Sequence, residues 1–422
     1  MELSPAHKTT AIGAIPEEWD VKPMSAVLAK ARLGGNYPNQ LAETDFPLMK
    51  MGNIARGVFD VSTFEYISPR TIPEAQHRLS CGDVLFNTRN TLDLVGKVAI
   101  WRDELPTAYY NSNLLRLEFK PSEIASSVFA NYWLNTAAAV SRLRALATGT
   151  TSVAAIYTRD LLRFDVAVPP PHEQTAIATV LSDVDSLLVE QDALIVKKRA
   201  MRQGAMQELL TGKLRLPGFS GEWNLQRLGD AAVLKARIGW QGLTTAEYLD
   251  SGDYYLVTGT DFTSGKIDWA NCHYVTKYRY DQDPYIQIAP RDVLVTKDGT
   301  IGKVAIVDAV DKPGTLNSGV FVIRPKSKSF VPEFFYYLLL SDVFDKFLSQ
   351  LSAGSTINHL YQKDFVGFTY RLPPTEEEQV AIAEVLRDMD TDIDVLEAKR
   401  EKTALLKHGM MQELLTGRIR LV

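Results

Sequence analysis

Several short stretches of the chain hold residue types that can do chemistry, and each can be compared with the pattern that its chemistry requires. The two cysteines, Cys81 and Cys272, lie far apart, and only Cys272 has a histidine, His273, beside it. A structural zinc site needs four closely spaced ligands, and a disulfide framework needs several cysteines. We therefore expect no metal and no disulfide framework.

The motifs of nucleotide and methyl-donor chemistry are present only in fragments. The stretch GTIGKV at 299–304 has the wrong spacing for a phosphate-binding loop and lacks its final hydroxyl residue. The double prolines in VPPPH (168–172) and LPPTE (372–376) lack the flanking Asn or Asp and the aromatic residue with which DNA methyltransferases hold a flipped base. A hydrolase GxSxG motif is also absent. We expect no catalytic residues and no cofactor.

Four aspartates, Asp388, Asp390, Asp392 and Asp394, alternate along a segment with helical periodicity. Residues two apart on a helix do not share a face, so these carboxylates do not form the cluster of a metal-dependent nuclease. We expect them to be solvated.

Charge and hydropathy bound the remaining functions. The 422 residues carry a net charge of −5, which disfavours a protein that coats nucleic acid by charge alone. Any DNA contact must then come from local basic loops or be shared with a partner. No segment approaches the ~18 apolar residues of a membrane span, and the first residues lack the layout of a signal peptide. We expect a cytoplasmic protein without a membrane partner.

Internal repetition is the strongest feature of the chain. Residues 173–216 and 378–421 align without a gap at an offset of 205, and 21 of the 44 positions are identical. Weaker echoes surround them: Asp-Val-Leu followed by Gly-Lys-Val-Ala-Ile occurs at 83–100 and again at 292–306. The chain therefore alternates variable and constant segments, as a duplicated frame with two different heads would.

The constant segments have the periodicity of long helices that pair. Apolar residues recur at alternating steps of four and three, which is the pattern of a coiled-coil seam. We expect the two helices to pair through Ile177, Leu181, Val184, Leu188, Ile382, Leu386, Met389 and Ile393. Prolines precede each helix, Gly212 and Gly417 suit its end, and Gly204 and Gly409 are expected to interrupt it late.

The variable segments mix strands with helices. Short runs rich in Val, Ile, Leu and Phe predict strands at 84–86, 98–100 and 114–119, and again at 293–295, 304–306 and 320–323. Residues 129–146 and 332–350 each have the pattern of one helix. The predicted fold class is therefore α/β.

These features together resemble the specificity (S) subunit of type I restriction-modification systems. The resemblance rests on Ile15–Trp19 and Gly221–Trp223 at the start of each half, and on the repeated Asp-Val-Leu and Gly-Lys-Val-Ala-Ile. It also rests on Pro-Pro followed by Glu-Gln entering each helix, and on Gln-Glu-Leu-Leu-Thr-Gly-(Lys/Arg)-x-Arg-Leu leaving it. The set spans nearly the whole chain.

The resemblance implies two mixed α/β target-recognition domains joined by two long antiparallel coiled-coil helices, with pseudo-two-fold internal symmetry. The expected segments are recognition domain 1 (1–172), a central spacer helix (173–216), recognition domain 2 (217–376) and a C-terminal spacer helix (377–422). The implied partners are double-stranded DNA, two methyltransferase (M) subunits and motor-nuclease (R) subunits. The implied role is to read a bipartite DNA target with an unspecified gap, and to direct adenine methylation and restriction by those partners.

Loops between strands can present donors to phosphates and base edges, so candidate DNA contacts lie there. In the first head we expect DNA contacts from Asn36, Arg89, Asn90, Lys97, Thr150, Thr151 and Ser152. In the second head we expect them from Trp240, Gln241, Lys297, Lys303, Ser355 and Thr356. Lys97/Lys303 and Thr150/Ser355 occupy equivalent positions in the two repeats, so we expect them to contact the DNA backbone. Asn36, Trp240 and Gln241 have no equivalent in the other repeat, so we expect them to contact bases.

Two other classes of function stay open from the residues alone. One is a scaffold whose heads bind protein, which would bind without the steep salt dependence of DNA contacts. The other is an enzyme with an unfamiliar site, which would have to methylate or cleave DNA as an isolated chain.

Overall fold

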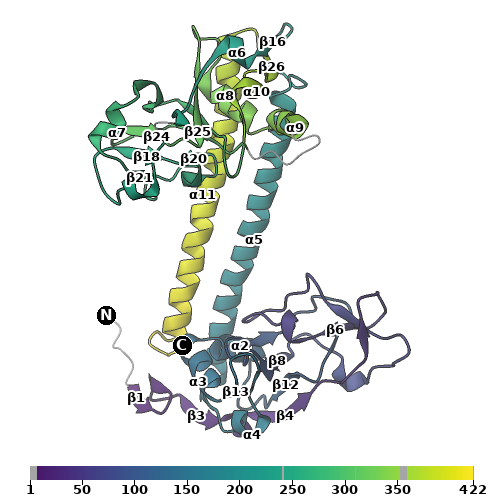
Figure 1. The fold of residues 1–422 in the computed structure, drawn as a ribbon. Helices are drawn as coiled ribbons and strands as arrows, with labels where there is room; N and C mark the ends of the chain where they lie inside the picture. The colour runs from purple at the N-terminus through teal and green to yellow at the C-terminus, as the bar shows by residue number, and fades with distance from the viewer. Residues whose placement is uncertain (1–6, 240–241, 309, 352–358, 422) are drawn as a thin grey trace. The chain divides into compact units, whose positions relative to one another are not determined.

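Two compact units make up the chain in a computed structural model that describes residues 7–239, 242–308, 310–351 and 359–421. Residues up to Asp192 join those from Lys399 onward in the first unit, and Ala193–Ala398 form the second. Each unit is a head of strands and short helices together with parts of two long helices, α5 (Pro171–Leu209) and α11 (Glu376–Leu414) (Figure 1). The predicted mixture of helix and strand is confirmed, and the division into four segments stays a prediction.

The head of the first unit is built on a four-stranded antiparallel sheet in the order β10–β8–β12–β4. These strands are β4 (Leu28–Leu33), β8 (Val84–Asn87), β10 (Val98–Ile100) and β12 (Leu114–Phe119). Smaller sheets comprise β1 (His7–Thr10), β2 (Gly13–Pro16), β3 (Asp20–Pro23), β5 (Asn39–Gln40), β6 (Pro47–Met49), β7 (Glu65–Ile67), β9 (Arg89–Asn90), β11 (Tyr109–Tyr110), β13 (Thr148–Gly149), β14 (Ala154–Ala155) and β15 (Asp165–Val168). The helices are α1 (Met24–Val27), α2 (Ser127–Leu134), α3 (Ala137–Ala145) and α4 (Thr158–Leu161), with 3-10 turns at Met51–Asn53 and Ala75–His77.

The head of the second unit repeats this topology. Its main sheet has the order β17–β25–β22–β23, which matches β4–β12–β8–β10 strand for strand. These strands are β17 (Ala232–Lys235), β22 (Val293–Thr296), β23 (Val304–Ile306) and β25 (Val320–Pro325). The others are β16 (Asn224–Arg227), β18 (Tyr255–Val257), β19 (Phe262–Thr263), β20 (Lys266–Ile267), β21 (His273–Tyr274), β24 (Gly314–Leu316) and β26 (Thr369–Leu372). The helices are α6 (Leu228–Ala231), α7 (Lys277–Asp281), α8 (Pro332–Leu339), α9 (Asp342–Leu351) and α10 (Gln362–Phe365), with 3-10 turns at Thr245–Glu247, Gly259–Asp261 and Pro284–Ile286.

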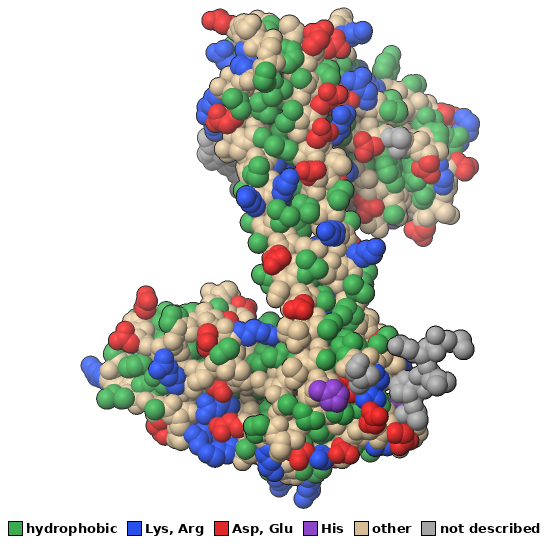
Figure 2. All heavy atoms as spheres, turned by 180° about the vertical axis from the view of Figure 1, so that it is seen from behind, with side chains coloured by type: hydrophobic (Ala, Val, Ile, Leu, Met, Phe, Trp, Pro, Cys, Tyr) green, Lys and Arg blue, Asp and Glu red, His purple; other side chains and the backbone are tan. Residues whose placement is uncertain are grey.

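The surfaces of the units carry mixed charge. On the face drawn in Figure 2, acidic and basic side chains are interspersed over each unit. Within the described residues, no helix combines the length and the hydropathy needed to cross a membrane.

The predicted single helices at 129–146 and 332–350 are wrong, because each region forms two helices with a hydroxyl residue at the break. Thr136 Oγ1 donates to the carbonyl of Trp133, which closes α2, and accepts from Ala139 N at the start of α3. Ser341 Oγ does the same between α8 and α9. A side-chain hydroxyl that satisfies end groups of both helices stabilises the break.

The long helices end near Gly212 and Gly417, as the sequence predicts. They continue through Gly204 and Gly409, where the sequence predicts an interruption. Gly212 and Gly417 follow the helices with φ of +71° and +70°, the left-handed conformation of a helix stop. Gly204 and Gly409 lie inside continuous helices, so their predicted interruption is wrong. Flanking residues of the repeat pack into the head cores and hold the helix through these glycines: Met206, Leu209 and Leu210 in one unit, and Leu414 and Leu415 in the other.

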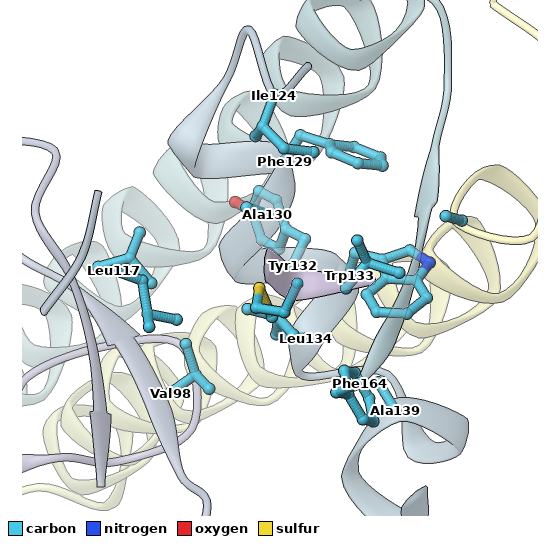
Figure 3. Packing of buried hydrophobic residues seen from close by; sticks show 14 of the residues in the cluster. Val98, Leu117, Ile124, Phe129, Ala130, Tyr132, Trp133, Leu134, Ala139 and Phe164 are labelled. Atoms are coloured by element: carbon cyan, nitrogen blue, oxygen red, sulfur yellow. The ribbon is translucent and has the colours of Figure 1, made fainter. Parts of the chain in front are cut away.

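The seam residues are buried most deeply near the helix starts. Ile177 and Leu181 join the core of the first unit, where Leu414, the last residue of α11, and Leu415 also lie. Ile382 and Leu386 join the core of the second unit with Met206 and Leu209 of α5. Further along, Val184, Leu188 and Met389 are half-buried and Ile393 is buried. Figure 3 shows part of the first core, where α2 contributes Phe129, Tyr132 and Trp133.

A buried glutamate at the start of α5 anchors the first head. Glu173 is fully buried; its carboxylate accepts a hydrogen bond from Trp19 Nε1 at 2.8 Å and pairs with Arg420 at 2.5 Å. Arg420 also pairs with Glu18 at 2.7 Å, and its hydrogen bonds to Glu173 raise the pKa of its guanidinium. We call Trp19, Glu173 and Arg420 anchor cluster 1. It joins the beginning of the head to the start of one constant segment and the end of the other.

Anchor cluster 2, formed by Arg215, Trp223 and Glu378, repeats this arrangement in the second unit. Arg215 donates from Nε and one Nη to the buried Glu378 carboxylate at 2.5 and 2.7 Å. The guanidinium lies 5.9 Å from the centroid of the Trp223 ring. Unlike Trp19, Trp223 has a buried Nε1 that makes no hydrogen bond within the described residues. The two clusters thus share their ion pair and differ in the tryptophan contact.

The glutamine after each anchor glutamate binds the backbone just before a head helix. Gln174 Oε1 accepts from Ala125 N, and its Nε2 donates to the carbonyls of Glu123 and Pro169. In the second unit, Gln379 Oε1 accepts from Val331 N just before α8. The repeated Glu-Gln pair therefore has a structural explanation. The glutamate binds an arginine near the end of the other constant segment, Arg420 for Glu173 and Arg215 for Glu378, and the glutamine binds the head.

A tyrosine–aspartate contact one layer further along each helix joins it to its head again. Tyr132 of α2 donates to Asp185 at 2.5 Å, and Asp185 pairs with Lys407 of α11 at 2.5 Å. At the repeated positions Tyr337 donates to Asp390, which pairs with Arg202. Burial and the hydrogen bond to Asp185 raise the pKa of Tyr132 to about 12. Each contact therefore keeps the tyrosine neutral as a donor.

Three of the four alternating aspartates of α11 form ion pairs with residues outside that helix. Asp390, Asp392 and Asp394 contact Arg202, Lys198 and Lys266, respectively. The expectation of solvated carboxylates holds for Asp392 and Asp394, which are exposed, and is wrong for Asp390, which is half-buried. Exposed pairs of this kind contribute little to stability singly, about 0–1 kcal/mol, so they orient the helix more than they stabilise it.

The two tryptophans provide a matched test of anchor cluster 1. We expect Trp19→Phe to destabilise the first unit by about 1.5–3 kcal/mol more than Trp223→Phe destabilises the second, because only Trp19 hydrogen-bonds a charged group. Hydrogen-exchange mass spectrometry during denaturation, which reports each unit separately, measures both effects. Equal destabilisation by the two substitutions would contradict the assigned role of Trp19 Nε1.

Candidate nucleic-acid interface

Five of the seven predicted DNA contacts of the first head gather on one small sheet. Strand β14 pairs with β9 on one side, placing Asn90 opposite Ala154 and Arg89 opposite Ala155. On its other side β14 pairs with β13, and the hairpin between them carries Thr150, Thr151 and Ser152. All three hairpin residues and Arg89 are exposed, and Asn90 is half-buried. Residues 60 positions apart in the sequence thus present donors side by side.

Asn36 and Lys97 lie on loops that adjoin this sheet. Lys97 is half-buried, and its carbonyl accepts from Asn87 N at 2.9 Å at the end of β8. Asn36 is exposed and follows Gly35, which bonds the turn at 110–112 through its backbone. The next residue of that turn, Asn113, accepts from Thr88 N and Oγ1. The structure therefore brings the seven candidates of this head onto connected loops.

A buried polar residue at the end of β8 organises these loops, and the sequence reasoning missed it. Asn87 is fully buried; its Oδ1 accepts from Arg89 N and its Nδ2 donates to the carbonyl of Leu94. The signal was a polar residue ending an apolar strand, but only burial distinguishes it from a solvated one. Asn87 fixes the backbone that carries Arg89.

The second head has a different polar residue at the same place. Thr296, buried at the end of β22, donates to the carbonyl of Thr300 and accepts from Lys303 N at 2.9 Å. Lys297 follows it, with backbone bonds to Gly319 and Leu360. Lys297 and Lys303 are both half-buried and lie at the two ends of one loop. Of the other candidates in this head, Trp240, Gln241, Ser355 and Thr356 lie outside the described residues.

A buried arginine lies close to Trp240 and Gln241 in the sequence. Arg237 is 1% exposed and donates to the Leu316 carbonyl at 2.9 Å, to Thr315 Oγ1 and to Gln282. Burial lowers the pKa of its guanidinium. Burying an arginine is costly unless hydrogen bonds satisfy it, so these contacts fix the backbone at Arg237. Sequence reasoning missed this residue because a lone arginine gives no sign of its burial.

The side chains on these loops are hydrogen-bond donors and acceptors suited to phosphates and base edges. In both heads the loops leave the same end of the main sheet, after β8 and after β22. What the two heads share is the frame, and what differs is the side chains that the loops present. This is the property expected of two recognition surfaces with different targets.

A family model described as the type I restriction modification DNA specificity domain matches residues 16–195 and 221–405. The chain belongs to this family. It is a DNA-recognition subunit of a type I restriction-modification system and not a catalytic one.

Curated relatives support this assignment along nearly the full chain. The putative type I restriction enzyme MjaX specificity subunit of Methanocaldococcus jannaschii is 27% identical over 424 residues, covering 98% of this chain and 96% of the relative. The type I restriction enzyme StySPI specificity subunit of Salmonella potsdam is 22% identical, covering 97% and 90%, respectively.

Solved structures share the fold. The S subunit of a type I restriction-modification system from M. genitalium has a TM-score of 0.60 at 16% identity, covering 98% of this chain and 99% of that one. A structure from work on complex assembly and conformational transition of the type I system has a TM-score of 0.56 at 16% identity, covering 96% and 99%.

The matched lysines test the assignment of backbone contacts. We expect Lys97→Ala and Lys303→Ala each to weaken binding of the assembled complex to its target and to lower the slope of log K against log salt by about one, since each removes one phosphate contact. Lys8→Ala, in the β1–β2 hairpin, is the control and should leave the slope unchanged. Binding isotherms across a salt series measure this, and an unchanged slope for both variants would remove these lysines from the interface.

Proposed function

We propose that the chain reads a bipartite DNA target with an unspecified gap, and that it directs adenine methylation and restriction by partner subunits in the cytoplasm. The observation that carries the proposal is the repeated sheet order in the two heads, combined with different residues on the loops that follow β8 and β22. One frame used twice with different loops suits two different half-sites. Residues 1–172 and 217–376 are the proposed recognition domains.

The two long helices are the proposed spacer. Each has 39 residues, which corresponds to roughly 58 Å of α-helix. Dimeric readers bind half-sites about one helical turn, ~34 Å, apart. We propose that segments 173–216 and 377–422 pair as an antiparallel coiled coil with pseudo-two-fold symmetry, and that its length sets the gap.

Ion pairs within each unit support the antiparallel direction. In the first unit Asp185 pairs with Lys407, and Asp192, seven residues later, pairs with Arg400, seven residues earlier. In the second unit Lys198 pairs with Asp392 and Arg202 pairs with Asp390. The partner number falls as the α5 number rises, which is the order of antiparallel helices.

The proposed partners are double-stranded DNA, two methyltransferase subunits and motor-nuclease subunits. The family assignment supports them, because a specificity subunit without catalytic residues requires other chains for methylation and cleavage. A related structure also comes from work on the assembly of the type I system.

Mapping methylated bases tests the bipartite target. We expect two short defined blocks, different from each other, at one fixed separation in the DNA methylated by the assembled complex. The blocks should differ because the loops of the two heads differ. Methylation-sensitive sequencing of genomic DNA measures this, and an uninterrupted motif or a perfect palindrome would contradict the proposal.

A change in helix length tests the division of work between spacer and heads. We expect insertion of four residues after Val189, matched by four after Thr403, to keep both half-sites and lengthen the gap by roughly two base pairs. Four residues add about 6 Å of helix, and a base pair rises about 3.4 Å. As the control, replacing residues 1–172 with another family member's head should change one half-site and leave the gap alone. An insertion that alters the bases read would contradict this division.

A further inference from the structure

A tyrosine recurs at the same place in both heads, beside the loops of the candidate interface. The residue before Tyr157 donates its backbone N–H to the Thr88 carbonyl at 3.0 Å, just after β8. The residue before Tyr361 donates its backbone N–H to the Lys297 carbonyl at 2.8 Å, just after β22. Both tyrosines therefore lie at the end of the main sheet from which the candidate loops leave.

The helices that follow these tyrosines do not explain them. Each tyrosine is the N-cap residue of a four-residue helix, α4 or α10, and its side chain makes no capping hydrogen bond. Ser, Thr, Asn and Asp are preferred at an N-cap because their side chains accept from the first backbone N–H groups. The rings remain large and accessible, with Tyr157 49% and Tyr361 55% exposed. A tyrosine at both N-caps therefore points to a contact outside the chain.

A basic side chain lies against each ring. The guanidinium of Arg159 lies 5.5 Å from the centroid of Tyr157, and the ammonium of Lys363 lies 5.5 Å from the centroid of Tyr361. Both basic residues are exposed, and the ion pair that Arg159 forms with Asp160 at 3.5 Å is exposed as well. The positive charge is therefore kept two positions after the tyrosine, although the residue that carries it changes.

The recurrence of the tyrosine and the charge indicates what they bind. In the proposed function the residues that read bases differ between the heads, because the half-sites differ. A residue kept in both heads suits what two half-sites have in common, which is the sugar–phosphate backbone. Tyrosine hydroxyls and basic side chains both donate to phosphate oxygens, and the tyrosine ring offers an apolar face to the deoxyribose.

We propose that Tyr157 with Arg159, and Tyr361 with Lys363, bind the DNA backbone at one equivalent nucleotide of each half-site, whatever its base. The inference rests on the proposed function, in which each head reads one half-site. It adds four residues to the candidate interface and gives them a separate task. They position each head along the duplex, while other loop residues read the bases.

Serine substitutions separate this contact from folding. Tyr157→Ser and Tyr361→Ser remove the ring and place a preferred N-cap residue before α4 or α10, so each unit should keep its stability or gain some. Arg159→Gln and Lys363→Gln remove only the charge. Binding of the assembled complex is measured on a duplex that contains its methylation target, and on a second duplex in which both blocks are scrambled.

Tyr285→Ser is the matched control. Tyr285 is 65% exposed, and the ammonium of Lys235 lies 4.9 Å from its ring centroid. The matching 3-10 turn of the first head has Gln76 instead, so this tyrosine does not recur. Its carbonyl accepts from Arg324, which pairs with Asp292 just before β22, at the end of the main sheet opposite the candidate loops.

We expect each serine variant to bind both duplexes about tenfold more weakly and to keep the ratio between them, because it loses a hydrogen bond to a charged group that every sequence offers. Each glutamine variant should lower the slope of log K against log salt by about one. Tyr285→Ser should bind both duplexes as the wild type does.

Unchanged affinity in both serine variants would overturn the proposed backbone contact. A loss confined to the target duplex would also overturn it and assign the tyrosines to base reading. A loss of methyltransferase subunits, counted by native mass spectrometry, would overturn it by assigning them to a protein contact. A wild-type complex that binds both duplexes equally would instead contradict the proposed function, and binding to the scrambled duplex would still test the tyrosines.

Discussion

The buried carboxylate of Glu173 and its ion pair with Arg420 determine how the first unit is put together. A charged group removed from water is costly, and removing one partner of a buried pair costs about 3–5 kcal/mol. The partners here are 247 residues apart, so the pair forms only when the end of the chain has returned to the first head. Glu378 and Arg215, 163 positions apart, impose the same condition on the second unit.

This constraint explains the pattern of repetition. The recurring residues gather where a helix meets a head: Glu and Gln at its start, the aspartate that binds a head tyrosine, and the Leu-Leu-Thr-Gly run at its end. Between these ends the helices contact each other through pairs such as Asp192–Arg400 and Lys198–Asp392, which are exposed and can be exchanged for other pairs at little cost. The residues at the ends of each helix must therefore fit both a head and the other constant segment. The residues in the middle of each helix contact mainly the other helix, so their identity can change.

Much of the frame could be predicted from the sequence, because its signals are periodic and duplicated. The six central strands were predicted at β8, β10, β12, β22, β23 and β25, where apolar runs lie between turn residues. The breaks at Thr136 and Ser341 were not, since a mid-helix hydroxyl has the same sequence signature whether it caps a new helix or bonds its own. At Gly204 and Gly409 the sequence predicts a break that the helices do not have, because packing of the flanking residues outweighs the low helix propensity of glycine.

The sequence could predict which loops carry the candidate residues and not the buried residues that support those loops; the role of the candidates in binding DNA stays a prediction. Strand ends followed by Asn, Lys and Thr marked the loops after β8 and β22, and the structure brings Arg89 beside the hairpin that holds Thr150. The supporting residues Asn87, Thr296 and Arg237 were missed, because their burial depends on contacts from segments far away in the sequence. Comparison of the two halves of the sequence identifies the loops whose residues differ between the heads. The fold is needed to identify the buried residues that fix the backbone of those loops.

The ion pair between Arg420 and Glu173 has a consequence for recombination of the gene. Arg420, near the end of the second constant segment, contacts Glu173 and Glu18 of the first unit. Every residue of the two ion pairs lies in a constant segment, so a single genetic crossover within the sequence encoding Met206–Gly212 exchanges one head together with the second constant segment and leaves both pairs intact. New combinations of heads can therefore arise in a single recombination event, each already fitted to the frame that receives it.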